Sequence, residues 1–354
     1  MSGSRAGARE GLAEGEQVAR VIRPSISDVA RRAGVSTATV SHVYNGTRFV
    51  AEPTRQRVMA AAAELSYRPN LVAGAMRSKR TRAVGAVLAL PGAEPFATTI
   101  MQGVEFALAE AGISLLFSDS RNDPDRELEA IAMLESRLVD GLVLLPATGG
   151  GSYYERMVER GRSSAGRPIV LIDAQVEGCS SVSSDLYTPT LEAMEQLIAK
   201  GHRRIALLRN DKDVTVSRAK LAGYHDALRR HGMDSDRWVF AGGMTLADGA
   251  RLMHEILDQG EATAVIIANH IMMLGALPVL RTRGVSVPDE LAILGFEEYP
   301  WMGAVLPSIS VITQDPYAIG VEAARVILEL GGARSGGPPI VRTVPTSFVD
   351  RGSL

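Results

Sequence analysis

The chain of 354 residues contains a single cysteine, Cys179. One cysteine cannot form an intrachain disulfide, and this composition is typical of a reducing cytoplasm. Aromatic residues make up only 5% of the chain, and no apolar run is long enough to span a membrane. Residues 1–20 are rich in Gly, Ala, Glu and Arg and lack the apolar centre of a signal peptide. We therefore expect a cytoplasmic protein without a membrane segment.

The sequence also lacks the common catalytic motifs. No Gly-x-Gly-x-x-Gly follows the apolar segment 84–90, and there is no Walker loop, His-Glu-x-x-His or Gly-x-Ser-x-Gly. The glycines from Gly149 to Ser152 have no accompanying lysine, so a flexible loop is favoured over a phosphate cradle. The six histidines show no metal-ligand spacing. We predict no enzymatic activity, no cofactor and no metal site.

Two short helices with a tight turn between them are predicted near the amino terminus. Ser27 is the expected N-cap of the first helix, and Asp28 suits the positive end of its dipole. Gly34 is expected to end this helix, because a left-handed residue at that place suits glycine best. Three apolar positions share one face of it: Val29, Ala30 and Ala33.

Ser36 is the expected N-cap of the second helix. Its inward positions are Val40, Val43 and Tyr44, and its outward positions are Thr37, Ala38, Ser41 and His42. This pattern is typical of a helix-turn-helix, whose second helix lies in the DNA major groove. The alternative is a helical hairpin in a core, but residues 58–65 supply a third helix to cover the other two.

Charge is distributed unevenly along the chain, although the net charge is only −2. Residues 20–82 contain 12 Lys or Arg against three acids, a net +9, and residues 83–354 carry −10. A solvated charged face usually mixes both signs. A basic end joined to an acidic body instead favours a DNA-binding head on a sensor.

Strands and helices alternate from residue 83 onwards, which predicts parallel sheets covered by helices on both faces. There are too many units for one small sheet, so we expect two Rossmann-like lobes with a cleft between them. The predicted strands are 84–90, 114–118, 141–145, 169–172, 205–208, 264–268 and 291–295. The predicted helices are 100–111, 125–137, 190–200, 217–231, 247–259, 270–283 and 316–329.

Six segments of the chain resemble the lac repressor family of bacterial transcription regulators. They are Ser36 to Val50, Tyr67 to Ser78, Leu138 to Gly141, Gly201 to Ala206, Gly295 to Glu298 and Arg351 to Ser353. The resemblance covers residues 25–354, and the head looks most like the purine repressor branch. It implies an all-α helix-turn-helix head and an α/β core of the periplasmic-binding-protein type, whose chain crosses between the lobes three times.

The resemblance also implies how the chain is divided. We expect a disordered tail over residues 1–24, a DNA-binding domain over 25–69, a hinge helix or plain linker over 70–82 and a core for effector binding and dimerisation over 83–354. The lac repressor carries a further C-terminal helical extension that makes tetramers. Here the chain ends at Leu354, just beyond Arg351 to Ser353, so a homodimer is expected.

Side-chain type suggests the roles on DNA. Thr37 can hydrogen-bond a base edge, Ala38 can contact a thymine methyl, and His42 can donate to guanine. Thr39, Ser41 and Arg55 suit phosphates, which set position rather than sequence. Two further roles come from the resemblance: Arg48 as a base or phosphate contact, and Met76 as a wedge in the minor groove.

The effector positions implied by the resemblance are partly kept and partly changed. Phe96, Asp173 and Gln314 match the family. Lys220 replaces an arginine with a point charge that has no planar fork, His270 replaces an aspartate, and Met244 replaces an aromatic residue. These changes suggest that the effector is neither an ordinary sugar nor a purine. An anionic or phosphorylated ligand would suit them, and so would the absence of any small-molecule effector.

We therefore predict a dimeric regulator, most simply a repressor, that binds a pseudo-palindromic operator in double-stranded DNA. Effector occupancy would change the arrangement of the lobes and hence the affinity for DNA. Two alternatives come from other classes: an architectural DNA-binding protein that uses the same head, and a solute-binding protein. The second would need a secretion signal and has no reason to carry the basic head.

Overall fold

The computed structural model describes residues 24–45, 48–67, 81–89, 95–147, 166–211, 214–233, 236–332 and 338–354. It divides into two compact units, Met1–Gly74 and Ala75–Leu354. Three expectations fall outside the described residues: the disordered tail up to residue 23, the hinge with Met76, and the loop from Gly149 to Ser152.

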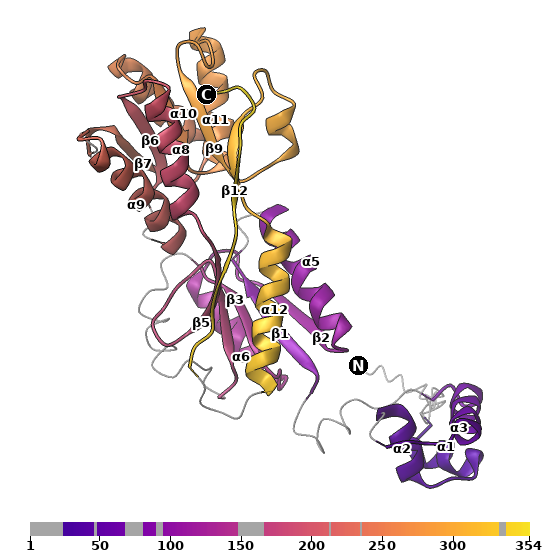
Figure 1. Cartoon of the computed structure of the whole chain (residues 1–354). Helices are drawn as coiled ribbons and strands as arrows, with labels where there is room; N and C mark the ends of the chain where they lie inside the picture. Colours follow the sequence, from indigo (N-terminus) through magenta and orange to yellow (C-terminus); the bar gives the residue numbers. More distant parts are fainter. Residues whose placement is uncertain are drawn as a thin grey trace, which may run out of the picture. The chain divides into compact units, whose positions relative to one another are not determined.

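The first unit is a small bundle of helices, drawn in indigo in Figure 1. Its helices are α1 (Ile26–Ala33), α2 (Thr37–Asn45) and α3 (Glu52–Glu64). Each helix contributes a fully buried valine to one core: Val29, Val40 and Val58. The third helix begins six residues before the predicted start, because Pro53 is tolerated in a first turn, where no intrahelical N–H bond is needed.

The ends of α1 and α2 are set by their capping residues. The predicted N-cap Ser27 is wrong, because Ser25 caps α1 in a capping box with Asp28. The Asp28 carboxylate accepts from the Ser25 N–H at 2.9 Å, and the Asp28 N–H donates to Ser25 Oγ at 3.3 Å. Gly34 ends α1 in the left-handed region, as predicted (φ 65°). The Thr39 N–H donates to Ser36 Oγ at 3.1 Å, which confirms the cap of α2.

The second unit is the core, which contains two six-stranded sheets. Lobe 1 has the strand order β11-β5-β4-β3-β1-β2, with all neighbours parallel. Its strands are β1 (Ala83–Leu88), β2 (Ser114–Asp119), β3 (Leu142–Leu145), β4 (Ile169–Ile172), β5 (Ser180–Ser184) and β11 (Val341–Val344). Its helices are α5 (Pro95–Glu110), α6 (Pro124–Ser136) and α12 (Pro316–Gly332).

Lobe 2 has the order β12-β10-β9-β8-β6-β7, parallel except for β12 against β10. Its strands are β6 (Ile205–Asn210), β7 (Val239–Gly242), β8 (Ala264–Ile267), β9 (Ala292–Phe296), β10 (Ser310–Thr313) and β12 (Ser347–Val349). Its helices are α8 (Tyr187–Ala199), α9 (Thr215–Arg230), α10 (Leu246–Gln259) and α11 (His270–Arg283), with short 3-10 turns η1 (Asp236–Trp238) and η2 (Pro300–Gly303).

The chain passes between the lobes three times, as predicted: after β5, after β10 and after β11. The last passage is the yellow strand segment that runs from one lobe to the other in Figure 1. Two lobes with parallel sheets confirm the predicted architecture. Within the described residues, no helix is long and apolar enough to cross a bilayer.

Five strands were not predicted: β5, β7, β10, β11 and β12. The sequence of β5 is Ser-Ser-Val-Ser-Ser, yet all five residues are buried. Its serines pack between β4 and β11, so burial is set by neighbouring strands and not by side-chain polarity. The edge strands β11 and β12 are short and half-exposed, which gives them little apolar pattern to read.

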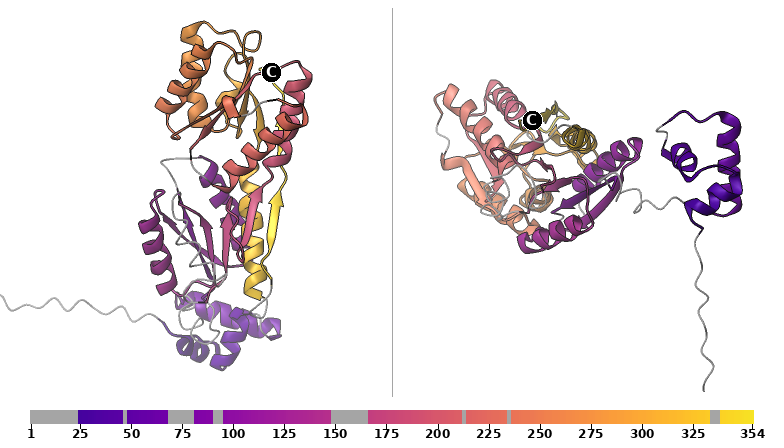
Figure 2. Two further views of the ribbon diagram at one scale, coloured as in Figure 1. Left: turned by 90° about the vertical axis from the view of Figure 1, so that its left-hand side faces the viewer. Right: turned by 90° about the horizontal axis from the view of Figure 1, so that it is seen from below.

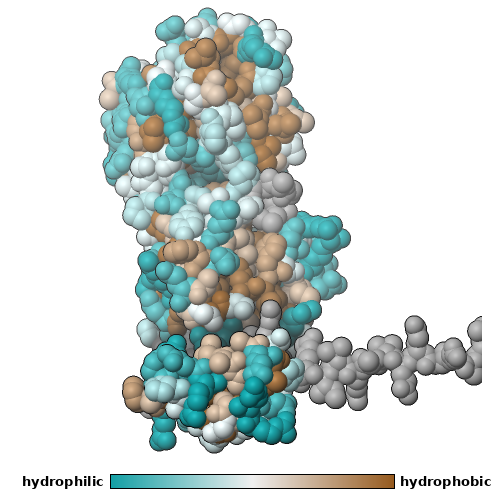
Figure 3. Space-filling view, turned by 90° about the vertical axis from the view of Figure 1, so that its right-hand side faces the viewer, coloured by the Kyte–Doolittle hydropathy of each residue, from teal (hydrophilic) through white to brown (hydrophobic). Residues whose placement is uncertain are grey.

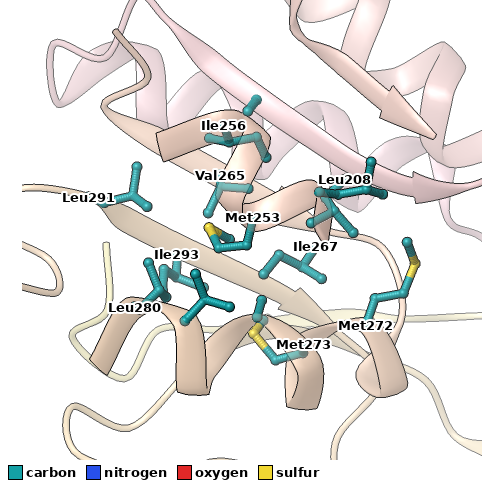
Figure 4. Close-up of a cluster of buried hydrophobic side chains, with 14 of the residues drawn as sticks. Leu208, Met253, Ile256, Val265, Ile267, Met272, Met273, Leu280, Leu291 and Ile293 are labelled. Carbon is teal, nitrogen blue, oxygen red and sulfur yellow. The ribbon is translucent and has the colours of Figure 1, made fainter. Parts of the chain in front are cut away.

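Helices cover both faces of each sheet, as Figure 2 shows in its left view. Alternate residues of one strand therefore enter different cores: in β8, Val265 and Ile267 pack toward α10 and α11, whereas Ala264 and Ile266 pack toward α8 and α9. The close-up in Figure 4 shows the first of these two layers, where Met253, Met272 and Met273 fill space among branched side chains.

Candidate functional site

The outward face of α2 carries the side chains predicted to meet DNA. Thr37 and Ala38, in its first turn, are exposed, and Thr39, Ser41 and His42 are partly exposed. Thr39 Oγ1 also lies 2.9 Å from Ser36 Oγ, so this hydroxyl takes part in the cap. The structure therefore presents the first turn of the helix most openly.

The bundle holds α2 firmly from behind. Val40 is fully buried beneath it, and Tyr44 meets Tyr67 edge-to-face with ring centroids 5.9 Å apart. An ion pair between Arg32 and Glu64, at 2.6 Å, links α1 to α3. The outward face is consequently presented by a rigid helix and not by a loop.

Two arginines follow α2 in the sequence. Arg48 precedes α3 and Arg55 lies in its first turns, and both are exposed. Within the described residues, neither side chain forms an ion pair or a hydrogen bond. Both guanidinium groups are therefore available to phosphate oxygens, which accept readily from arginine.

The second candidate site lies where strands of the core end. Asp173 directly follows β4 of lobe 1. In lobe 2, His270 begins α11 after β8, Glu297 follows β9, and Gln314 follows β10. In open parallel sheets, ligands bind beyond the carboxyl ends of the strands, so these residues occupy the usual place for a ligand site.

Lys220 is the central cation of this group and is 7% exposed. Its Nζ donates to the carbonyl of Ala268 at 2.8 Å and lies 4.2 Å from the centroid of the Phe296 ring. Burial lowers the pKa of Lys220, while the charges of Glu297 and Asp173 act in the opposite direction. The ammonium is thus enclosed by a carbonyl and an aromatic ring, with both carboxylates close enough to interact with it.

His270 is paired with Glu297. Its Nδ1 lies 2.6 Å from Glu297 Oε2, and its ring lies against Tyr299 with centroids 4.2 Å apart. The His270 side chain is 8% exposed and that of Glu297 is 15% exposed. A close charge-capable pair in this environment fixes both side chains, because either one alone would be costly to bury.

Asp173 supplies the carboxylate of lobe 1. Its backbone is left-handed (φ 51°), which is uncommon for a residue other than glycine. Its Oδ1 accepts from the Ser184 N–H at 3.2 Å, and Ser184 Oγ in turn accepts from Gln314 Nε2 at 2.9 Å. Burial raises the pKa of Asp173 to about 6, and the nearby charge of Glu297 acts in the same direction.

The remaining predicted effector positions are less closely tied to this group. Met244, exposed beyond β7, accepts a weak contact from Asn210 Nδ2 at 3.5 Å, and Asn210 Oδ1 accepts from Ser217 Oγ at 3.1 Å. Ser217 lies one turn before Lys220 on α9. Phe96 is half-buried and packs against the core of lobe 1, without a described contact to the other five.

Sequence reasoning missed Glu297, Asn210 and Tyr299. Glu297 follows a predicted strand directly, so its place at a strand end was available as a signal. Asn210 was hidden because β6 runs two residues beyond its predicted end. The sequence also could not reveal that Lys220 has internal partners, and these partners weaken the case for Lys220 as the grip for an anion.

Comparisons with known proteins agree with this geometry. Residues 25–70 match the family described as bacterial regulatory proteins, lacI family, and residues 194–354 match the periplasmic binding protein-like domain. The chain is 30% identical over 308 residues to the HTH-type transcriptional repressor PurR of Haemophilus influenzae (strain PittEE), covering 86% of this chain and 90% of that protein. It is 32% identical over 306 residues to the ribose operon repressor of Bacillus subtilis (strain 168), covering 86% and 90%.

A solved structure is similar over almost the whole chain. It is the lac repressor dimer bound to operator and the anti-inducer ONPF, with a TM-score of 0.80 and 26% identity, covering 93% of this chain and 98% of that one. The relatives named here are transcriptional repressors and not enzymes.

Proposed function

Because this chain belongs to the lacI family of bacterial regulatory proteins and is a DNA-binding transcription regulator, we propose that it acts as a dimeric repressor at a palindromic operator. The observation that carries the proposal is the exposed first turn of α2, where Thr37 and Ala38 lie on a rigid helix. The net charge of +9 over residues 20–82 supports binding of this helix to DNA. Residues 25–69 would form the DNA-binding domain, residues 70–82 the hinge and residues 83–354 the core.

The proposed contacts fall into two groups. Thr37, Ala38 and His42 would read base edges, with Arg48 beside them. Thr39, Ser41 and Arg55 would bind phosphates and set the position of the helix, and Met76 would act from the hinge. The relative bound to operator has a similar fold over almost its whole length, which supports this use of the head.

Exposed apolar side chains on both lobes support a dimer. In lobe 1, Phe106 of α5, Phe117 of the edge strand β2 and Tyr317 of α12 are 47%, 46% and 39% exposed. In lobe 2, Leu274 is 40% and Leu306 97% exposed. Figure 3 shows apolar surface on both lobes of one face of the core. Large exposed apolar patches mark interaction sites, and a second copy would cover them.

We propose further that a small molecule bound beyond the strand ends of the core controls DNA affinity, and that it is not an ordinary neutral sugar. Three positions would lack the groups that bind such a sugar: the planar arginine is replaced by Lys220, the aspartate by His270 and the aromatic ring by Met244. Three effector positions of the family would remain: Phe96, Asp173 and Gln314. Lys220 is bonded to Ala268 and His270 to Glu297, so both side chains already have partners within the protein. This also favours a second candidate, a regulator that acts without an effector.

The experiment is a selection of random duplexes by the purified full-length chain at moderate salt, followed by measurement of affinity for the enriched site. A specific regulator should enrich a palindrome and bind it at least ~1,000-fold more tightly than bulk DNA. Thr37→Ala should relax preference at one symmetric pair of positions. An architectural protein would enrich no palindrome, and that result would reject the proposal.

A further inference from the structure

The chain enters lobe 1 at Thr81 and Arg82, the two residues directly before β1. The carboxylate of Asp140 accepts a backbone N–H from each of them: Oδ1 accepts from Thr81 at 3.0 Å, and Oδ2 accepts from Arg82 at 2.8 Å. In return, the Asp140 N–H donates to the carbonyl of Ala83 at 2.7 Å. One side chain in the loop before β3 thus uses both of its oxygens to hold the start of β1.

The side chains of Thr81 and Arg82 bond to the same end of the lobe. The Thr81 hydroxyl donates to the carbonyl of Leu138 at 2.7 Å, and Arg82 Nη2 donates to the carbonyl of Ala111 at 3.1 Å. Arg82 and Leu138 both have a left-handed backbone (φ 54° and 60°), which is uncommon for residues other than glycine and persists where the surroundings fix it. The place where the chain enters lobe 1 is therefore a fixed point of the core.

This fixed point lies at the end of lobe 1 opposite the candidate core site. Thr81, Ala111 and Asp140 precede the strands β1, β2 and β3, whereas Asp173 follows β4. Because all strands of this sheet are parallel, the two groups belong to opposite edges of it. The covalent connection to the head, through residues 68–80, joins lobe 1 at the edge away from the candidate effector site.

The reach of this connection is counted between the last fixed residues on either side. These are Tyr67, at the end of the described head, and Thr81. An extended chain spans about 3.3–3.6 Å per residue, so release of Thr81 and Arg82 would lengthen the reach of the head by about 7 Å. Two base pairs of DNA rise by the same amount, at about 3.4 Å each. In a dimer, the separation of the two heads has to match the spacing of the half-sites.

We propose that Asp140 is a positioning residue for operator recognition. By fixing Thr81 and Arg82, it sets how far each head can reach from lobe 1, and hence which half-site spacing the dimer accepts. This inference rests on the proposed function, a dimeric regulator at a palindromic operator. Asp140 would act through the chain that it holds and not by contact with the DNA.

The test uses the full chain and two duplexes: the palindrome enriched by selection, and the same palindrome with one base pair inserted at its centre. Fluorescence anisotropy measures both affinities at one salt concentration. The wild type should bind the enriched spacing at least about 100-fold more tightly than the longer one. The ratio of two affinities from one preparation does not depend on the fraction of folded protein, so a loss of stability alone would leave it unchanged.

Asp140→Asn should lower this ratio at least about tenfold, because the amide offers one acceptor oxygen where the carboxylate offers two. Hydrogen exchange at the amides of Thr81 and Arg82 should become faster in the same variant. Asp125→Asn is the matched control: it makes the same chemical change on an exposed side chain at the start of α6 and should leave the ratio unchanged.

Thr81→Val is a second variant that leaves Asp140 in place. It removes the bond from the Thr81 hydroxyl to Leu138 and keeps the backbone N–H that Asp140 accepts. The ratio should fall about threefold, as expected for the loss of one neutral hydrogen bond. This variant tests the same fixed point if Asp140→Asn does not fold.

Three results would overturn the inference: equal binding of both spacings by the wild type, an unchanged ratio in the variants of the fixed point, or an equal fall of the ratio in Asp125→Asn. Enrichment of a palindrome by the wild type alongside any of them would leave the proposed regulator standing. Failure to enrich any palindrome would reject the proposed function itself.

Discussion

The two candidate sites of this chain differ in how their side chains are held before any partner binds. On the head, Thr37, Ala38 and Arg48 point to solvent without partners among the described residues. In the core, Lys220 and His270 are buried and already bonded to protein atoms. The first site offers polar groups on a rigid support, and the second is a network of side chains already bonded to one another.

Because of this difference, we expect the two sites to respond differently to substitution. A change on an exposed face affects the partner and leaves the fold intact. A change inside a charged network should alter the stability of the protein itself. Both tryptophans, Trp238 and Trp301, lie in lobe 2, so tryptophan fluorescence reports on the core, whereas far-UV circular dichroism also reports on the head.

The largest effect should come from Lys220→Met. Removing the ammonium takes away the cation that interacts with both Asp173 and Glu297, which should lower the free energy of unfolding at pH 7.5 by about 3–5 kcal/mol. Acidification to pH 5 should recover part of the loss, because protonation relieves the repulsion. Urea unfolding followed by tryptophan fluorescence measures both values.

Lys200→Met is the matched control for this variant. Lys200 is 43% exposed and lies 3.8 Å from Asp350, so its loss should change stability by less than about 1 kcal/mol. Equal effects of the two substitutions would contradict the buried network.

A large effect on DNA binding should come from Ala38→Glu. A carboxylate in the first turn of α2 would face phosphates and base-edge acceptors, so operator affinity should fall roughly 100-fold while the unfolding transition stays in place. Fluorescence anisotropy with a labelled operator measures the loss. Ala63→Glu, an exposed site on α3 outside the proposed contacts, should lose much less. Similar losses would show that net charge, and not the face of α2, governs binding.

Asp173→Asn should have a moderate effect on stability, and it should stabilise the protein where Lys220→Met destabilises it. The folded-state pKa of Asp173 is raised from 3.8 to about 6, so the folded protein holds this proton more tightly than the unfolded chain does. The ionised carboxylate therefore destabilises the fold above pH 6, and neutral Asn should raise stability at pH 7.5 by about 1–3 kcal/mol. The gain should shrink as pH falls through 6 and vanish below pH 4. A gain independent of pH would argue against titration of Asp173 as its cause.

The smallest effect should come from Ser25→Ala, which removes the capping box of α1. The head should lose about 1 kcal/mol, and the core should lose nothing. Thermal melts by circular dichroism should show an earlier transition of the helical head, while the tryptophan signal is unchanged. Ser27→Ala is the natural comparison, since Ser27 is not the cap.

Most of the fold could be predicted from sequence because it depends on local signals. Periodicity placed the helices, Gly34 and Ser36 marked the turn between α1 and α2, and repeated strand–helix units implied two parallel sheets. What failed were strands whose burial depends on neighbours, such as β5 with its four serines, which no apolar pattern indicates.

The two sites divide in the same way. The exposed positions of α2 followed from helical geometry alone, since a residue opposite a buried face must face solvent. The core site could not be completed, because the bonds from Lys220 to Ala268 and from His270 to Glu297 join residues 48 and 27 positions apart. Residue type at one position says nothing about such a partner.

The order in which the chain visits its lobes has a consequence for synthesis on the ribosome. The helices of the head are complete once residue 67 has emerged, so this unit can form early. Lobe 1 receives its sixth strand, β11, only at residue 341, and lobe 2 receives β12 only at residue 347. A nascent chain therefore carries a finished DNA-binding head long before either lobe of the core can complete its sheet.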